Sequence, residues 1–488
     1  NTSITAATGG LTMHGTANVE ATASSVRLAA GSDLTVGNVA AAKVSLLSGE
    51  DIVNAAGSAK NVTAPGLRIE ADGSVGTASR HLTTDIDNLS ASAATGSIFI
   101  TEDNRVTVTG ITVTVTEFNS NASTETLTDA NQSDLVTGSN GDIVLVAKLG
   151  NIVLNNGADA DGETVNANGT GRILIDAISG NLTATADILS ESGIITLTGK
   201  NKVDLRAGVD VVTAANISIT AETGALIMRG ATTVEAAASS ARLNAALDLT
   251  VGNVTATKVS LVSGEDIINA AGSAKNVTAT SLRIEADGSV GTASRHLATD
   301  IDNLSASAAT GSIFITEDSR VIVTGIAVTV TEFSANTSTN IVTDANQSDL
   351  VTGSNGNIVL VAKLGNIILN DGSDADSETI NADGGSIRIE ATAGNITARA
   401  DVASITGNIS LYASNSIRFT EGADISTTAT GTIDLWAEGG VITLAASANQ
   451  ISDSGDIRLR AAGNITLGGT VETTGNVSLI SDTGLILD

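Results

Sequence analysis

The residues best suited to chemistry in this sequence are two short runs of alternating carboxylates, each following a Gly-Asn strand pattern. Carboxylates spaced along a loop can supply several of the six to eight oxygen ligands that Ca²⁺ takes. The spacing matches neither an EF-hand nor the Gly-Gly-x-Gly-x-Asp repeat of calcium-loaded β-rolls. A solvated acidic loop is therefore the simpler interpretation, Ca²⁺ coordination is the alternative, and no other cofactor is predicted. The candidate ligands are Asp159, Asp161, Glu163, Asp374, Asp376 and Glu378.

A second candidate for chemistry is a histidine context that occurs twice. His81 and His296 each stand in Ser-Arg-His-Leu, shortly before Asp-Ile-Asp. An Arg-His-Asp group could serve in acid–base catalysis. The sequence shows no nucleophile elbow, metal-spaced His pair or phosphate-binding Gly loop beside it. We therefore predict loop salt bridges at these histidines, and we predict that the chain is not an enzyme.

Composition restricts what kind of core can position such residues. The chain has 488 residues, of which 42% are hydrophobic and only 1% aromatic, and it contains no Cys and one Pro. Aromatic side chains usually supply much of the buried area in globular cores, so a thin, uniform core of Val, Ile, Leu and Ala is expected. The net charge of −29 disfavours binding to nucleic acid or to anionic membranes. No apolar stretch reaches the roughly 20 residues that span a bilayer.

Internal repetition dominates the organisation of the chain. Residues 1–168 match residues 216–383 at most positions, and a one-residue deletion near Gly171 shifts the later correspondence. Duplication of this kind serves length and valency more readily than catalysis. The ends show no signal-peptide pattern and no polar cap, so we expect a piece of something longer, with open strand edges that associate end to end. The predicted parts are copy 1 at 1–215, copy 2 at 216–430, and divergent further coils at 431–488.

A shorter period runs within each copy. The phrase Gly-Asn/Asp-apolar-polar-apolar, as in residues 407–411 and 463–467, reads as a short strand entered through a tight corner. Strand starts recur every eight residues, so three strands give a coil of about 20–24 residues, the repeat of a stacked solenoid. We therefore predict an all-β, right-handed parallel β-helix. The strand starts that show the period best are Ile409, Ile417, Ile425 and Ile433.

One segment in each copy departs from this period. Residues 106–118 alternate for longer than a coil strand allows, and a polar stretch follows before the coil pattern resumes. We predict excursions at about 102–141 and about 317–356, each a strand pair or long loop standing off one face. Each excursion is either a tolerated insertion or a lateral contact surface for a ligand or a neighbouring rod.

Carbohydrate-active enzymes also use parallel β-helices, with carboxylates in a groove and aromatic side chains against which sugar rings pack. Here the aromatic residues are too few to predict such a platform. Phe99 and Phe314 lie within strand patterns and are predicted to be core residues. Tyr412 and Trp436 are predicted to stand alone.

The Gly-Asn-Ile-x-Leu phrase, the 20–24-residue period and the acidic, Cys-free composition resemble filamentous haemagglutinin-type repeats and giant β-strand-repeat bacterial surface proteins. The resemblance implies export to the bacterial cell surface and a structural shaft acting in adhesion, cell–cell contact or extracellular matrix. Expected partners are neighbouring copies, end to end or laterally, and cell-surface glycans or other cells, without nucleic-acid binding or membrane insertion. The alternatives are a carbohydrate-active β-helix enzyme and a segment that itself binds a glycan.

Overall fold

The computed structural model describes residues 1–157, 159, 161–374 and 376–488. Within those ranges the regular structure consists of strands, and no helix is found that could cross a membrane. The chain forms two compact units. The first comprises Asn1–Ser239 and Val330–Val342, and the second comprises Ser240–Thr329 and Thr343–Asp488.

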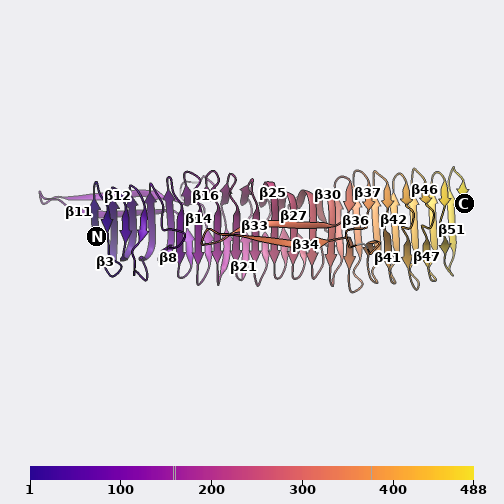
Figure 1. Cartoon of the computed structure of the whole chain (residues 1–488), viewed down its shortest axis with the longest axis horizontal. Coiled ribbons are helices and arrows are strands. Elements are labelled where there is room, and N and C mark those ends of the chain that lie inside the picture. Colours follow the sequence, from indigo (N-terminus) through magenta and orange to yellow (C-terminus); the bar gives the residue numbers. More distant parts are fainter. Residues whose placement is uncertain (158, 160, 375) are drawn as a thin grey trace. The chain divides into compact units, whose positions relative to one another are not determined.

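Residues 143–228 of the first unit form successive coils of three short strands, and these strands pair in parallel with their equivalents in the next coil (Figure 1). Nearer the N-terminus, longer strands such as β3 (Asn18–Ala30) and β5 (Asn38–Ser48) take part in the same parallel pairing. β14 pairs with β17, β15 with β18, and β16 with β19. This arrangement confirms the predicted all-β parallel β-helix. The strands of these two coils are β14 (Ile143–Ala147), β15 (Ile152–Leu154), β16 (Glu163–Ala167), β17 (Ile173–Ala177), β18 (Asn181–Ala184) and β19 (Asp187–Ser190).

The second unit shows the predicted eight-residue spacing directly. β42 (Ile409–Ala413), β43 (Ile417–Phe419) and β44 (Ile425–Thr427) form one coil, and β45 (Ile433–Ala437) begins the next. Ile409 pairs with Ile433 in register, so identical apolar side chains stack inside the coil. Burying each such side chain is worth roughly 1.5–3 kcal/mol. One stack of inward residues, each no more than 1% exposed, consists of Ile387, Ile409, Ile433 and Ile457.

A buried amide side chain holds one of the corners in the first unit. Asn61 is fully buried, and its Nδ2 donates to the Val36 carbonyl at 2.7 Å and to Asn54 Oδ1 at 3.1 Å. Its Oδ1 accepts from both the backbone N–H and the hydroxyl of Thr83 at 2.9 Å. The Asn61 side chain therefore satisfies groups of neighbouring coils that water cannot reach. Asn276 makes the equivalent amide contacts in the second unit.

Each predicted excursion is an antiparallel hairpin, narrower than expected. In copy 1 it consists of β11 (Ile111–Phe118) and β12 (Thr124–Gln132). The flanking strands β10 (Val106–Val108) and β13 (Leu135–Thr137) pair in parallel with β15 and β16. They remain part of the coil because their inward residues continue its apolar stack. The hairpin of copy 2 consists of β33 (Ile326–Phe333) and β34 (Thr339–Gln347).

The first hairpin lies along the face of its unit and does not stand off it for most of its length. Asp129 forms an ion pair with Arg27 at 3.1 Å, and Gln132 Nε2 donates to the Ile69 carbonyl at 2.7 Å. Val115, in the hairpin strand β11, is fully buried. The base of the second hairpin repeats these polar contacts through Asp344 with Arg242 and Gln347 with Ile284.

Replacing Asn61 with Ala is expected to lower the free energy of unfolding by about 2–4 kcal/mol, because Thr83 N–H would lose its acceptor and the buried Asn54 Oδ1 would lose its donor. The matched control is Asn201→Ala, at an exposed position where the side chain donates only to the Ser179 carbonyl. Urea denaturation of both variants measures the difference. Equal stability of the two variants would contradict the role assigned to Asn61.

Candidate cation site

Each unit holds a cluster of three carboxylates, one buried and two exposed. Asp159 and Asp161 lie beside Asp134, and one carboxylate oxygen of each is within 4.8 Å of the others. Asp134 is only 3% exposed. The structure thus brings together two of the predicted candidates and adds a third residue from a distant segment. The cluster of the second unit consists of Asp349, Asp374 and Asp376.

Asp134 stands where the chain leaves the hairpin strand β12 and rejoins the coil at β13. Its backbone φ is +67°, a left-handed conformation that Asp tolerates better than most residues. The loop between β15 and β16 approaches this point closely at Gly157, where a Cβ would collide with the Ser133 hydroxyl. The glycine therefore allows the acidic loop to lie against the return of the hairpin.

The predicted ligands Glu163 and Glu378 lie outside the two clusters of three. Glu163 Oε2 accepts a hydrogen bond from Asn166 Nδ2 at 2.7 Å, and its backbone N–H donates to Asp161 Oδ1 at 2.9 Å. The Glu163 side chain is thus turned toward β16, while its backbone helps to orient Asp161. Glu378 makes the same two contacts with Asn381 and Asp376.

One backbone position keeps a left-handed conformation where the two copies differ in sequence. Gly162 has a φ of +93°, and Ser377 at the corresponding position has a φ of +71°. A non-glycine residue in this region is strained by roughly 1–3 kcal/mol. The second copy therefore maintains the left-handed backbone at this position despite losing the glycine.

The electrostatics of the cluster are unusual for a protein surface. Burial, followed by repulsion from Asp159 and Asp161, raises the pKa of Asp134 to about 7. The pKa of Asp349 is raised to about 7 by burial and by repulsion from its neighbouring carboxylates. Each site therefore favours either a bound proton or a compensating cation.

No protein-family model, curated protein or solved structure matches this chain.

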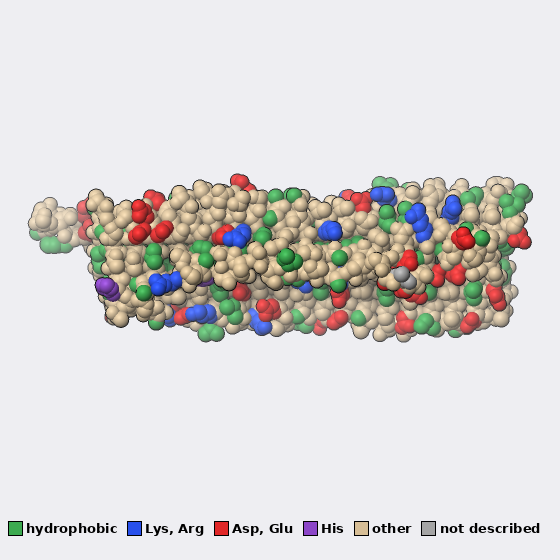
Figure 2. Space-filling view, viewed as in Figure 1, with side chains coloured by type: hydrophobic (Ala, Val, Ile, Leu, Met, Phe, Trp, Pro, Cys, Tyr) green, Lys and Arg blue, Asp and Glu red, His purple; other side chains and the backbone are tan. Residues whose placement is uncertain are grey.

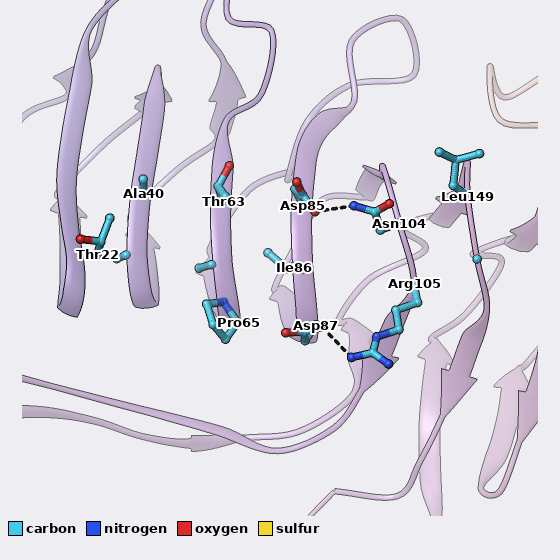
Figure 3. A pocket seen from close by; sticks show the side chains of 13 residues that line it. Thr22, Ala40, Thr63, Pro65, Asp85, Ile86, Asp87, Asn104, Arg105 and Leu149 are labelled. Carbon is cyan, nitrogen blue, oxygen red and sulfur yellow. Dashed lines mark hydrogen bonds and ion pairs between the residues drawn. The ribbon is translucent and has the colours of Figure 1, made fainter.

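The groove drawn in Figure 3 has a volume of about 720 Å³ and contains two carboxylates, Asp85 and Asp87. Asp85 accepts from Lys60 at 2.7 Å and from Asn104 at 2.7 Å, and Asp87 pairs with Arg105 at 3.2 Å. The hydrogen bond from Lys60 is the main reason that the pKa of Asp85 lies below its usual value. A general acid needs a raised pKa, so Asp85 is suited to ion pairing and not to proton donation.

The histidine of copy 1 is packed and makes no ion pair with an Asp in the described residues, contrary to the predicted salt bridge. His81 Nε2 donates to the Ala335 carbonyl at 3.0 Å, which leaves Nδ1 to accept from Thr101 Oγ1 at 2.7 Å. Its ring centroid lies 5.6 Å from that of Phe99. Burial lowers the pKa of His81, which favours the neutral imidazole and a structural role.

Tyr412 and Trp436, predicted to be isolated, are neighbours on adjacent coils. Their ring centroids lie 5.1 Å apart in an edge-to-face arrangement, because β42 and β45 pair with these residues in register. The Arg460 guanidinium lies over the Trp436 ring at 5.5 Å. Arg388 and Arg458 line the adjoining cavity of about 410 Å³. The second unit therefore presents a small aromatic surface flanked by arginine–carboxylate ion pairs, which the sequence alone did not reveal.

The apolar surface on the outside of the first unit centres on Phe99, which was predicted to be a core residue. Ile98 and Ile100 fill the coil interior, so Phe99 between them faces outward. It forms a cluster with Phe333, which is 1% exposed and comes from the tip of the second hairpin. That tip, residues 330–342, belongs to the first unit. The other buried members of the cluster are Val144, Val146 and Leu174.

Polar contacts fix the same tip in place. The Arg172 guanidinium lies 4.2 Å from the centroid of the Phe333 ring and donates to the Thr337 carbonyl at 3.2 Å. The Phe333 backbone N–H donates to Thr196 Oγ1 at 2.9 Å. In contrast Phe118, at the same position of the first hairpin, is 76% exposed.

Proposed function

We propose that this chain is a structural shaft segment of a very large secreted bacterial surface protein, acting in adhesion, cell–cell contact or extracellular matrix. Its proposed location is the bacterial cell surface or the extracellular space. The parallel coils of each unit and the near-identical repeats support a role based on length and repeated lateral surfaces. Under this proposal the chain is not an enzyme.

The observation that carries the proposal is the seating of Phe333. The tip of the second copy's hairpin packs on the outward Phe99 surface of the first copy, with an aromatic side chain inserted and hydrogen bonds around it. We call this contact between Phe333 and the Phe99 surface the interlock. The interlock resists separation of the tip of the second copy's hairpin from the first copy. A shaft under tension requires such resistance, whereas an isolated catalytic domain does not.

Both halves of the same interlock are also exposed elsewhere on the chain. Phe118 extends from the tip of the first hairpin at 76% exposure. Phe314, Val359 and Val361 occupy the Phe99 surface of the second copy and are only partly buried. His296 lies 5.7 Å from the Phe314 ring, as His81 does from Phe99. We therefore propose that the partner in assembly is another copy of this repeat, joined end to end.

Charge supports the proposed exclusion of nucleic-acid and membrane partners. The net charge is −29, and on the face drawn in Figure 2 the Lys and Arg side chains are scattered among acidic and uncharged surface. A phosphate backbone or an anionic bilayer would require a concentrated basic surface.

Sedimentation velocity over a concentration series tests this assembly. The wild-type chain is expected to form larger species as concentration rises, and Phe118→Ser and Phe314→Ser are each expected to suppress them. The double variant is expected to lose no more than either single variant, since one contact is removed twice.

The control for the assembly experiment is Leu247→Ser, which removes a different exposed apolar side chain and is expected to leave assembly unchanged. A wild-type chain that stays monomeric at high concentration, or assembly that survives loss of both phenylalanines, would contradict the proposed shaft contact.

A second candidate function, glycan binding, is favoured by the Tyr412–Trp436 pair beside Arg388 and Arg458. Aromatic faces pack against sugar rings, and guanidinium groups pair with the carboxylates of acidic sugars. The two arginines also pair with Glu390 and Asp434, so stacking on the rings would contribute most of the affinity.

Trp436→Ala is therefore expected to weaken binding of an acidic polysaccharide at least about fivefold, since loss of one stacking contact costs about 1–3 kcal/mol by analogy with base stacking. Binding to a glycan array measures the effect, with Phe118→Ser as the control outside this surface. Absence of binding by the wild-type chain, or equal binding by Trp436→Ala, would remove this candidate.

A further inference from the structure

The most conspicuous unsatisfied group in each unit is a carboxylate oxygen in the acidic cluster. Asp134 Oδ1 and Asp349 Oδ1 are buried and have no hydrogen-bond partner within the described residues. Each residue is only 3% exposed. Burying a carboxylate without a partner is costly. This free-energy cost occurs at the same position of both copies. The buried, unpaired carboxylate oxygen is therefore a constant feature of the repeat.

The surroundings of this oxygen repel an anion and supply no compensating side chain. Among the described residues, the ion pairs formed by Lys and Arg involve other carboxylates and none of the three in either cluster. Asp159 and Asp161 bring further negative charge to within 4.8 Å of Asp134. The geometry therefore creates a concentrated negative potential around a partly enclosed point.

We propose that each copy of the repeat binds one Ca²⁺ ion at this point. The ligands are three carboxylates in each unit. In the first unit they are Asp134, Asp159 and Asp161, and in the second unit Asp349, Asp374 and Asp376.

Further buried oxygen atoms without hydrogen-bond partners occur at both ends of the same loop among the described residues. Asn156 Oδ1 and Thr164 Oγ1 are buried without hydrogen-bond partners in the first unit, and Asp371 Oδ1 and Thr379 Oγ1 are so in the second. The change from Asn156 to Asp371 between the copies keeps a side-chain oxygen at this position. The three carboxylates of each cluster come from two protein segments and form an all-oxygen ligand set.

This ligand set favours Ca²⁺ over Mg²⁺. Ca²⁺ accepts six to eight oxygen ligands in irregular geometry, whereas Mg²⁺ requires a near-ideal octahedron and retains several waters. Carboxylates from a loop and from the end of a hairpin do not form a rigid octahedral cage. Dissociation constants of about 10⁻⁴–10⁻³ M are expected, as in extracellular calcium modules.

The position of the site gives the ion a structural effect. Asp134 lies two residues after the end of the hairpin strand β12, and Asp159 and Asp161 belong to the loop that enters β16 of the coil. A bound Ca²⁺ ion would tie the return of the hairpin to that loop. Calcium would thus stiffen the element that carries Phe118, whether or not that element joins copies together.

Calorimetric titration of the full chain with CaCl₂, after removal of divalent cations with EDTA, tests the proposal. The wild-type chain is expected to bind two Ca²⁺ ions. Asp134→Asn, which keeps the side-chain shape but removes the charge, is expected to bind one, and Asp134→Asn combined with Asp349→Asn is expected to bind none. Asp72→Asn, at an exposed acidic position, is the control and is expected to retain both sites.

A second measurement reports on structure and does not depend on the heat signal. Hydrogen exchange of residues 124–132 is expected to slow in CaCl₂ for the wild-type chain and to remain unchanged for Asp134→Asn. Circular dichroism verifies that each variant retains its strands. Absence of saturable Ca²⁺ binding, undiminished binding by the double variant, or equally tight binding of Mg²⁺ would overturn the proposal.

Discussion

The structure depends on apolar side chains that stack on their equivalents in the neighbouring coil. Ile409 lies between Ile387 and Ile433 along one ladder, and all three are buried. A single coil cannot bury its own apolar face, so every coil gains stability from the one on either side. The ladder hydrogen bonds follow this stack and satisfy the backbone groups that burial would otherwise leave unpaired.

Stacking also decides which outward residues become neighbours. Side chains on the outer face of a strand lie beside those of the next coil, although a whole coil of sequence separates them. Tyr412 meets Trp436 in this way. The hairpin of β11 and β12 does not interrupt this stacking. Ile98, before the hairpin, pairs in register with Ile143, after it, so the apolar stack continues without a break. Insertions are thus tolerated at the corners, and the surfaces able to bind partners lie on the outside.

The strand period was predictable from the sequence because the buried positions carry it. The starts of β42, β43, β44 and β45 lie at the predicted residues. The outer face was predicted less well. Phe99 was predicted to be a core residue because it lies within a strand pattern, although strict alternation with Ile98 and Ile100 places it outside. It is buried only because a distant hairpin tip covers it, and no local pattern signals such a contact.

The acidic site was predictable only in part, because one of its three carboxylates comes from a distant segment of the sequence. Asp159 and Asp161 formed a visible run, but Asp134 lies in a different segment and reaches them only through the fold. The recurrence of Ser-Asp-Leu before a strand, at residues 133–135 and 348–350, was the available signal. Its meaning depended on the close approach at Gly157, which sequence spacing does not reveal.

Diffraction from oriented samples of the chain tests the stacking of coils most directly. Coils that stack through parallel ladders predict a strong reflection at about 4.8 Å along the axis of orientation. A pattern without that axial reflection would contradict the β-helical stack, and the proposed shaft would fail with it.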